Sequence, residues 1–570
     1  MSDPITLQVI QSYLAAVARE MQTNIFRTGY STAVRESQDA SCALLDPEGN
    51  VVGAHVVLPL HMGTFPVVVR RILEAYPPAE LREGDAFITN HPYLCGLPHT
   101  SDMAVVTPIF YGGRLLGFAA TIAHKTDLGG LAPGGGSAQA RELFHEGTLV
   151  PPVRWARAGE ELPEVRVVLA ANSRTPDQVV GDVRGQVGTC RLGERRVQEL
   201  CAKYGPDLVQ AACAAAQRQT EQRLRAELRR WPDGVYEAER AMDHDGCDLD
   251  RPVRVHVRIA KRGDRIQFDF RGCHPQTRGP ANLRPPLVRA CCGYVLLALI
   301  DPTLPNNGGV ARVVETVFAA GTLLDPVYPA PVNNYIPAAS LVIETCLAAL
   351  APVVPDRAIA GPGGDGGIYL RGVDAAGQPF VLYEIQGSAY GGRAGADGVS
   401  CVCTYVSNCR ITPIEIIESE FPLRVTRFEP ITDSGGPGRY RGGLAYRREF
   451  EVLAPEARFS LRGGRHVVPA AGLFGGGPGR LGRCVVRRAN GEEVRLPSRV
   501  GEFPLRRGDR VLIEKAGAGG YGDPRTRPPE AVREDVLNGY VSLEAARAVY
   551  GLVDDGSASS VPEAWRQGGS

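Results

Sequence analysis

The chain has 570 residues, of which 44% are apolar and 22% charged, so it can form about three or four structural units and lacks the composition of a disordered protein. Its 63 basic and 63 acidic residues balance, which argues against a nucleic-acid-binding protein, because such proteins carry a basic surface. The most apolar run, residues 290–300, is well short of the about 20 residues of a membrane span, and no secretory signal is evident, so we expect a cytoplasmic protein with no membrane partner.

The first 185 residues have the pattern of an α/β unit. Asp3-Pro4, followed by apolar residues at steps of three and four, predicts a capped amphipathic helix. Three further elements are expected in this unit: a hairpin over residues 41–52, a helix over 65–75 and a second hairpin over 104–123.

The rest of the chain divides by composition. A helical, highly charged stretch predicts a long solvated helix, and strands near 253–270 with buried helices near 288–300 and 338–350 predict a middle α/β unit. Glycine clusters then alternate with short polar and apolar segments, which indicates a β-rich unit. We expect a mixed α/β (α+β), multi-domain fold, divided into an N-terminal α/β domain at 1–185, a connecting helix at 186–235, a middle α/β domain at 236–425, a β-rich domain at 426–527 and a helical tail at 528–570.

Histidine and aspartate residues gather in the first unit, which holds six of the ten histidines. His99 and Asp102 form an H-x-x-D element just before one predicted strand, and His124 and Asp127 form another just after its partner strand. The start of one strand lies beside the end of the other in a hairpin, so the two elements are expected to meet. Asp39, just before the first hairpin, can reach the same edge.

Two imidazole nitrogens and two carboxylate oxygens suit a divalent metal ion such as zinc, manganese or ferrous iron. An ion of this kind lowers the pKa of a bound water to about 7, which makes hydroxide available at neutral pH. The alternative is that these residues are ordinary hydrogen-bonding groups at strand ends, because the H-x-x-D spacing is short and common. Spacing alone leaves both interpretations open.

Other motifs favour structural roles. Residues 243–250 hold a second His/Asp cluster without the spacing of a calcium loop, and the glycine-rich residues 361–367 could cradle an anion but are more typical of tight turns. The sequence contains no P-loop motif and no G-x-S-x-G nucleophile elbow. The fourteen cysteines include no C-x-x-C pair, so we expect most of them to be buried thiols in a reducing compartment.

Segments along essentially the whole chain match one known family in order. They are DPITLQVI (3–10), DASCAL (39–44), LHMGTFP (60–66), AHKTDLGG (123–130), DFRG (269–272), PAPVN (329–333), GGRAGADG (391–398), NCRITP (408–413), DSGGPGRYRGG (433–443) and GGYGDP (519–524). By these segments the chain resembles the hydantoinase B/oxoprolinase family.

The resemblance implies one half of an ATP-dependent enzyme acting on cyclic amides or related carbonyl compounds. It implies that ATP is bound by a partner of the hydantoinase A type, which phosphorylates the carbonyl oxygen, while this chain holds a metal and completes the reaction. On that basis Asp39, His99, Asp102 and His124 are the expected ligands, with zinc as the first candidate metal and manganese or iron as alternatives. The lack of a P-loop and the presence of only four lysines agree with ATP being bound by the partner in a hetero-oligomer.

Further residues are expected around this site. His61 is a substitute ligand or catalytic group. Asp127 is expected either to orient a ligand or act as a base, or to be an exposed structural carboxylate. Glu142 and Glu146 are expected to support the ligands from an outer layer.

The resemblance defines the substrate less closely than it defines the fold. The chain has His91 in N-H-P-Y, where family members often have N-D-P-Y, and Lys125 where a second histidine is frequent. A cyclic amidohydrolase acting on a hydantoin, a lactam or a 5-oxoproline-type ring is the main hypothesis. A subunit of an ATP-dependent acetone- or acetophenone-type ketone carboxylase is the alternative, and a non-catalytic scaffold for an ATPase partner is a third.

Overall fold

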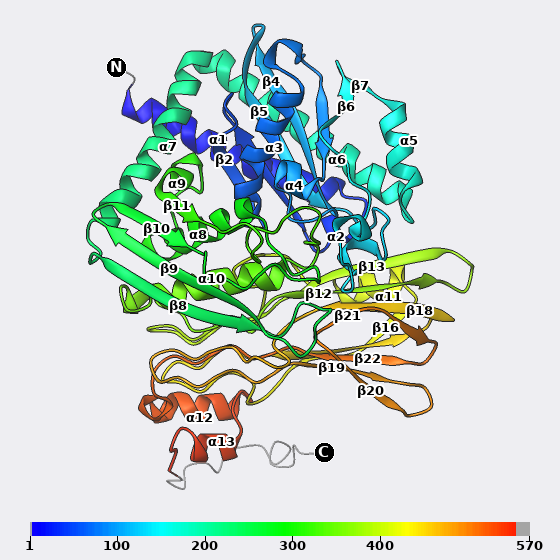
Figure 1. The fold of residues 1–570 in the computed structure, drawn as a ribbon, viewed down its shortest axis with the longest axis vertical. Helices are drawn as coiled ribbons and strands as arrows, with labels where there is room; N and C mark the ends of the chain where they lie inside the picture. Colours follow the sequence, from blue (N-terminus) through cyan, green and yellow to red (C-terminus); the bar gives the residue numbers. More distant parts are fainter. Residues whose placement is uncertain (1–2, 554–570) are drawn as a thin grey trace.

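The computed structural model describes residues 3–553 and shows a mixed α/β, multi-domain fold (Figure 1). A seven-stranded sheet with its helices comes first along the chain, and a four-stranded sheet with its helices follows. A second four-stranded sheet, a five-stranded sheet and a short two-stranded one make up the C-terminal part. The fold class expected from the sequence is therefore confirmed.

The N-terminal sheet is antiparallel, with the strand order β2-β1-β5-β4-β3-β6-β7. Both predicted hairpins are present, and β1 also pairs with β5, which joins them into one sheet. The strands are β1 (Ala40–Leu45), β2 (Val51–Val56), β3 (Ala86–Thr89), β4 (Asp102–Tyr111), β5 (Arg114–His124), β6 (Val153–Arg157) and β7 (Glu160–Glu161). The helices of this part are α1 (Pro4–Thr28), α2 (Thr32–Arg35), α3 (His61–Ala75), α4 (Pro92–Cys95), α5 (Pro163–Ala171), α6 (Pro176–Tyr204) and α7 (Pro206–Leu228).

Alternate residues of this sheet belong to two separate cores. Cys42 and Leu44 of β1 share a core with α1 and α6, whereas Ala43 and Leu45 share one with α3. Asp3 caps α1 by accepting hydrogen bonds from two backbone amides of the first turn, as its position predicts. Because helices cover both faces of the sheet, its central strands are buried along nearly their whole length and mostly apolar.

The prediction of a single solvated connecting helix at 186–235 is wrong. The structure has two helices here, because Gly205 adopts a φ of 82° and Pro206 starts a new helix. The first of them, α6, begins already at Pro176 and packs on β4 and β5, burying Val179 and Val183. The buried residues of α6 form an apolar stripe along one side of the helix. This stripe is hard to recognise in the sequence because α6 and α7 carry many charged residues on their other faces.

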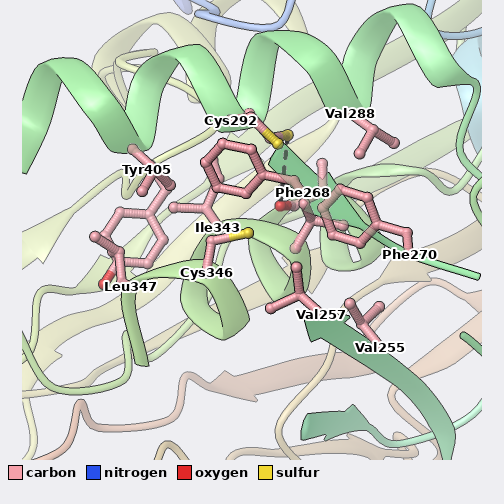
Figure 2. Close-up of a cluster of buried hydrophobic side chains, with 14 of the residues drawn as sticks. Val255, Val257, Phe268, Phe270, Val288, Cys292, Ile343, Cys346, Leu347 and Tyr405 are labelled. Carbon is pink, nitrogen blue, oxygen red and sulfur yellow. Dashed lines mark hydrogen bonds between the residues drawn. The ribbon is translucent and has the colours of Figure 1, made fainter. Parts of the chain in front are cut away.

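The middle part is a four-stranded sheet with two long apolar helices packed against it. Figure 2 shows Val255 and Val257 of β9 and Phe268 of β10 directed toward Cys292 of α8 and Cys346 of α10. The elements are β8 (Gly234–Met242), β9 (Val253–Arg262), β10 (Arg265–Asp269), β11 (Val314–Val317), α8 (Pro285–Ile300), α9 (Gly308–Val313) and α10 (Ile336–Leu350).

The C-terminal part is rich in β-structure, as expected. One sheet has the order β13-β12-β18-β21 and another the order β16-β17-β22-β19-β20, while β14 and β15 form a short pair. The strands are β12 (Gly366–Val373), β13 (Pro379–Gln386), β14 (Ser388–Ala389), β15 (Ser400–Val402), β16 (Leu423–Pro430), β17 (Tyr446–Val452), β18 (Glu456–Arg462), β19 (Arg483–Arg487), β20 (Glu493–Leu496), β21 (Arg499–Arg506) and β22 (Arg510–Glu514), with α11 (Ile414–Glu420) between β15 and β16.

The pairing of β12 with β18 joins strands from both sides of the domain boundary expected at residue 426. The proposed division into domains stays a prediction. Two short helices, α12 (Pro529–Leu537) and α13 (Leu543–Ala548), occupy the tail as the sequence suggests, and residues 554–570 of that tail lie outside the described part.

All fourteen cysteines are free thiols and ten are buried, in agreement with the sequence. Within residues 3–553, no helix has both the length and the apolar character needed to cross a bilayer.

Candidate metal centre

Strand pairing places the expected ligands at one edge of the N-terminal sheet. Asp102, the first residue of β4, pairs directly with His124, the last residue of β5. Asp39 immediately precedes β1, whose first residue Ala40 pairs with Ala123. The backbone carbonyl of Asp39 accepts a hydrogen bond from the His124 amide at 3.1 Å. Three strands therefore deliver these side chains to the same edge.

The carboxylate of Asp102 is the centre of the cluster. Its Oδ1 lies 3.2 Å from His99 Nε2 and 3.3 Å from His124 Nδ1, and each of these three residues offers a ligand atom within 4.8 Å of the other two. Its Oδ2 lies 3.7 Å from His61 Nε2, and Asp39 Oδ2 lies 3.9 Å from His124 Nδ1. Three of the four expected ligands, His99, Asp102 and His124, therefore form one compact group, while Asp39 and His61, which starts α3, each lie beside one member of it.

None of these five side chains is more than 2% exposed. Even so, four of their polar atoms have no hydrogen-bond partner: Asp39 Oδ1, His61 Nε2, Asp102 Oδ2 and His124 Nε2. A buried polar atom left unsatisfied costs about 1–3 kcal/mol, so several in one place fit a site that binds a ligand. The donor set of imidazole nitrogens and carboxylate oxygens suits a divalent cation.

Burial raises the pKa of Asp39 and lowers the pKa of His124, since both lose the water that solvates their charged forms. Burial would also raise the pKa of Asp102, but the neighbouring histidines outweigh it and hold that pKa well below its usual range. A metal binds carboxylates in the ionised form and imidazoles in the neutral form, and the directions for Asp102 and His124 favour these forms.

Residues from the middle of the chain cover His99. The side-chain oxygen of Asn333 contacts His99 Nδ1. An amide oxygen can only accept, so Nδ1 carries the proton and Nε2 is left with a free lone pair toward Asp102. The ring of Tyr335 packs edge-on against His99 with centroids 5.1 Å apart.

Tyr383 of β13 covers the other side of the cluster. Its hydroxyl donates to Asp39 Oδ2 at 3.0 Å, and its ring stacks on His124 at 4.1 Å. No motif in the sequence marks Tyr335 or Tyr383 as site residues. Asn333 is indicated by the sequence only as the last residue of the family-matching segment at 329–333.

The structure places His61 in the cluster but turns Asp127 away from it. Nδ1 of His61 lies 2.9 Å from Ser41 Oγ, which directs Nε2 toward Asp102. Asp127 is buried and pairs with the Arg174 guanidinium at 2.7 Å. The Asp127 contacts favour the structural alternative over the catalytic one, although its carboxylate is buried rather than exposed.

Glu146 supports the site through Asn333. Its Oε1 accepts hydrogen bonds from the amides of Val332 at 2.6 Å and Asn333 at 2.7 Å, which fixes the backbone that carries the Asn333 side chain. Glu142 instead lies at the surface, 3.3 Å from His145 Nε2. Of the two glutamates, only Glu146 is placed in an outer layer.

The two departures from the family pattern have structural roles. Lys125 is fully buried and donates to Gln186 Oε1 of α6 at 2.6 Å, and burial lowers its pKa to about 8. His91 caps α4 by accepting a hydrogen bond from the Leu94 amide at 3.2 Å. Neither side chain is a member of the metal cluster.

The other motifs also hold the fold together. Asp243 accepts hydrogen bonds from three consecutive backbone amides at 466–468, which ties the middle part to the C-terminal part. In the glycine-rich segment, the amides of Gly361 and Gly363 donate to the carbonyls of Ala471 and Ala389. Both motifs therefore have structural partners, although the Gly361 and Gly363 amides bond to distant segments and do not close a tight turn.

Comparisons with known proteins agree with this geometry. The family model described as hydantoinase B/oxoprolinase matches residues 3–524. A protein of Pseudomonas sp. (strain NS671) assigned as the B component of a D-/L-hydantoinase is 34% identical over 96% of this chain and 95% of its own. The beta component of the caprolactamase of Pseudomonas jessenii is 30% identical over 97% of both chains.

Two solved structures share the fold. The ATP-dependent caprolactamase from Pseudomonas jessenii superposes with a TM-score of 0.90 at 28% identity, over 99% of both chains. An acetone carboxylase in its nucleotide-free form also superposes with a TM-score of 0.90, over 97% of this chain and 80% of its own. Its identity is 20%, so it supports the fold alone.

Proposed function

Because the chain belongs to the hydantoinase B/oxoprolinase family, we propose that it is the metal-bearing subunit of an ATP-dependent cyclic amidohydrolase. The proposed substrate is a hydantoin, a lactam or a 5-oxoproline-type ring. The proposed partner is a hydantoinase A-type subunit that binds ATP and phosphorylates the ring carbonyl, so the active form is a hetero-oligomer.

The observation that carries the proposal is the buried cluster of five side chains with four unsatisfied ligand atoms. Clusters of this kind are costly for folding, and they are typical of metal and catalytic sites. Full-length relatives named as subunits of a hydantoinase and a caprolactamase support both the reaction class and the need for a second subunit.

In this proposal Asp39, His99, Asp102 and His124 hold one divalent ion, with zinc as the first candidate and manganese or iron as alternatives. When bound, such an ion supplies Lewis-acid activation of water or of a carbonyl oxygen. His61 is oriented by Ser41 toward the same point, where it can complete the ligand set or accept a proton.

There is a chemical reason for dividing phosphorylation and hydrolysis between two subunits. An amide carbonyl is a poor electrophile because its carbon shares electron density with the nitrogen. Phosphorylation of the oxygen in the partner removes that protection. The rings of Tyr335 and Tyr383 pack against His99 and His124, which limits the contact of water with the cluster where the activated carbonyl is attacked.

The purified complex of this chain with its partner tests the proposal. Supplied with ATP and a panel of hydantoins and lactams, it should form ADP, phosphate and a ring-opened product, and it should contain about one metal ion per chain. Supplied with ATP, labelled bicarbonate and a ketone, it should leave the label in bicarbonate. Label in an acid product would replace this proposal by the ketone carboxylase alternative.

The scaffold hypothesis predicts a different result. If the chain only stabilises an ATPase partner, His124→Ala will leave turnover intact as long as the complex assembles. The proposal expects assembly without hydrolysis, measured by size-exclusion chromatography and product formation on the same sample.

A further inference from the structure

A cavity of about 160 Å³ lies between α3 of the N-terminal part and α8 and α9 of the middle part (Figure 1). Gly63, Pro66 and Arg70 of α3 line it. Because 3.6 residues complete a helical turn, these three residues lie on the side of α3 opposite to His61. The cavity is therefore separate from the metal cluster, although α3 contributes residues to both.

The size and the lining of the cavity suit one small apolar group. An apolar cavity of about 150 Å³ is large enough to bind benzene. Most of the residues that line this one are apolar, including Met62 and Val67 of α3, Ala290 of α8 and Val310 of α9. A body of about six carbon atoms would therefore fill it.

The polar residues around the cavity are positively charged or neutral. Two arginines, Arg70 and Arg289, line it together with three asparagines, and no aspartate or glutamate of the described residues does so. Both arginines are exposed. The cavity thus presents two positive charges at its surface with no acidic group to balance them.

Neither of these arginines has a carboxylate partner within residues 3–553. Arg70 forms no hydrogen bond or ion pair there. Arg289 donates from Nε to Thr316 Oγ1 at 3.1 Å, which leaves both of its Nη atoms free. Neighbouring arginines that do not line the cavity are paired, since Arg71 contacts Glu74 and Arg312 lies 3.7 Å from a glutamate of α7.

We propose that this cavity binds a small carboxylate with an apolar body of about six carbon atoms. The apolar body lies between α3 and α8, where it is removed from water, and the guanidinium groups of Arg70 and Arg289 provide the charge and the donors for the carboxylate. A ligand that carries an ammonium group is disfavoured, because the cavity has no acid to receive it. The inference makes no assumption about the reaction at the metal cluster.

Benzoate is a suitable probe, and ligand-observed NMR with the full chain measures its Kd without turnover. Wild type should bind benzoate, and benzamide, which has the same ring and no charge, should bind at least about tenfold more weakly. A wild-type chain that does not bind benzoate would overturn the inference, as would equal affinity for the two compounds.

Substitution of the arginines tests where benzoate binds. Arg70→Gln and Arg289→Gln should each raise the Kd for benzoate by about tenfold, because each removes a charged donor. Arg71→Gln is the matched control: it removes the same charge from the next residue of α3, which does not line the cavity, and should leave the Kd unchanged. An unchanged Kd in both Arg70→Gln and Arg289→Gln contradicts the proposed site.

Filling the cavity gives a second, independent test. Ala290 is half-buried and lines the cavity, so Ala290→Leu should prevent benzoate binding. Ala298→Leu makes the same change at another half-buried position of α8 that does not line the cavity and should leave binding intact. The melting temperature shows whether each variant is folded. Benzoate binding that survives in folded Ala290→Leu would exclude this cavity as the site.

Competition with benzoate distinguishes two sources of the carboxylate, and only this step refers to the proposed function. Ring opening of a hydantoin leaves a carboxylate and a neutral urea group, whereas ring opening of a lactam leaves a carboxylate and an ammonium group. If N-carbamoylvaline displaces benzoate and 6-aminohexanoate does not, the ligand is a product of hydantoin opening. If neither displaces it, the site holds a carboxylic acid from another source. Should the complex hydrolyse no cyclic amide while benzoate binding depends on Arg70, the site stands and the proposed function fails.

Discussion

Asp102 is the residue on which the cluster converges, because its two oxygens face His61, His99 and His124. Asp102→Asn keeps the shape of the side chain and removes its charge. We expect this variant to lose metal affinity by more than about 100-fold, since even outer-layer changes cost 10–100-fold. Metal content after dialysis and competition with a chelator measure the effect.

Asp127→Asn is the matched control for that variant. Asp127 is also buried, but its partner is Arg174 rather than a histidine. The Asp127→Asn variant should keep wild-type metal affinity and lose only folding stability. Stoichiometric metal in Asp102→Asn, or metal loss in Asp127→Asn alone, would show that the ion is held elsewhere.

Asp365 gives a pH-dependent prediction at a position outside the metal cluster. Burial raises the pKa of this carboxyl to about 7, which outweighs the attraction of Lys515 and the hydrogen bond from the Thr404 amide at 2.9 Å. Between about pH 4 and 7 the unfolded chain releases this proton and the folded chain keeps it. The free energy of unfolding should therefore fall as pH rises through that window, by at most about 1.4 kcal/mol per pH unit.

Asp365→Asn should remove this contribution. Urea unfolding at pH 5 and pH 7.5 is the measurement, and the variant should gain stability relative to wild type at the higher pH. The same stability difference at both pH values would contradict a raised pKa for this carboxyl. If the contribution of Asp365 to the free energy of unfolding rose with pH, its pKa would be lowered in the folded protein rather than raised.

The meeting of His99, Asp102 and His124 follows from a local sequence pattern, whereas Asp39 joins them through the pairing of β1 with β5 and the covering residues come from still farther along the chain. Asp102 and His124 meet because one hairpin sets its own register, which a sequence shows directly. Tyr383 and Arg462, whose Nη2 donates to the Tyr383 hydroxyl at 3.3 Å, arrive from strands hundreds of positions later in the chain. No local pattern encodes how one sheet packs on another, so these residues could be found only in three dimensions.

At the scale of elements, the longer helices were predictable from periodicity, whereas the break between α6 and α7 and the environment of each helix were not. The apolar stripes of α1 and α3 stand out because their polar faces are short of charge. The stripe of α6 is interrupted by polar residues such as Gln186, whose amide is buried and donates to the Met103 carbonyl at 2.9 Å. Buried polar groups that are satisfied by hydrogen bonds resemble solvated ones in a sequence.

The crossing of α3 and α8 is the contact between elements that bears on the position of His61. Gly63 lies two residues after His61, and a Cβ on it would come within 2.0 Å of the Pro286 carbonyl oxygen. Gly63→Ala should therefore push α3 away from α8 and displace His61. We expect a loss of about 1–3 kcal/mol in unfolding free energy, together with weaker metal binding.

Gly188→Ala is the control for this helix prediction. Gly188 lies in α6 with nothing within 4 Å of an added Cβ, so alanine there should be neutral or stabilise by up to about 1 kcal/mol. Urea unfolding and metal titration of both variants make the comparison. A neutral Gly63→Ala would show that α3 and α8 can separate without cost.

At the scale of the whole molecule, the cluster lies where three parts of the chain meet. The N-terminal sheet carries the expected ligands, Asn333 and Tyr335 come from the segment that leads into α10, and Tyr383 and Arg462 come from the sheet that includes β12 and β13. Contacts between the parts therefore pass through the ligands themselves. An ion bound there stabilises the packing of the three parts and not only one hairpin.

Metal removal should consequently affect residues far from the ligands in sequence. A ligand present at about 100 times its Kd adds about 2.7 kcal/mol to stability, so chelation should lower the melting temperature by a few degrees. Hydrogen exchange should accelerate at residues 329–335 and in β13, because their contacts to His99 and His124 loosen. Asp102→Asn should show fast exchange in these segments with or without added metal. If chelation instead changes exchange only at the strand ends of β4 and β5, the ion stabilises that hairpin alone and the three parts pack independently of it.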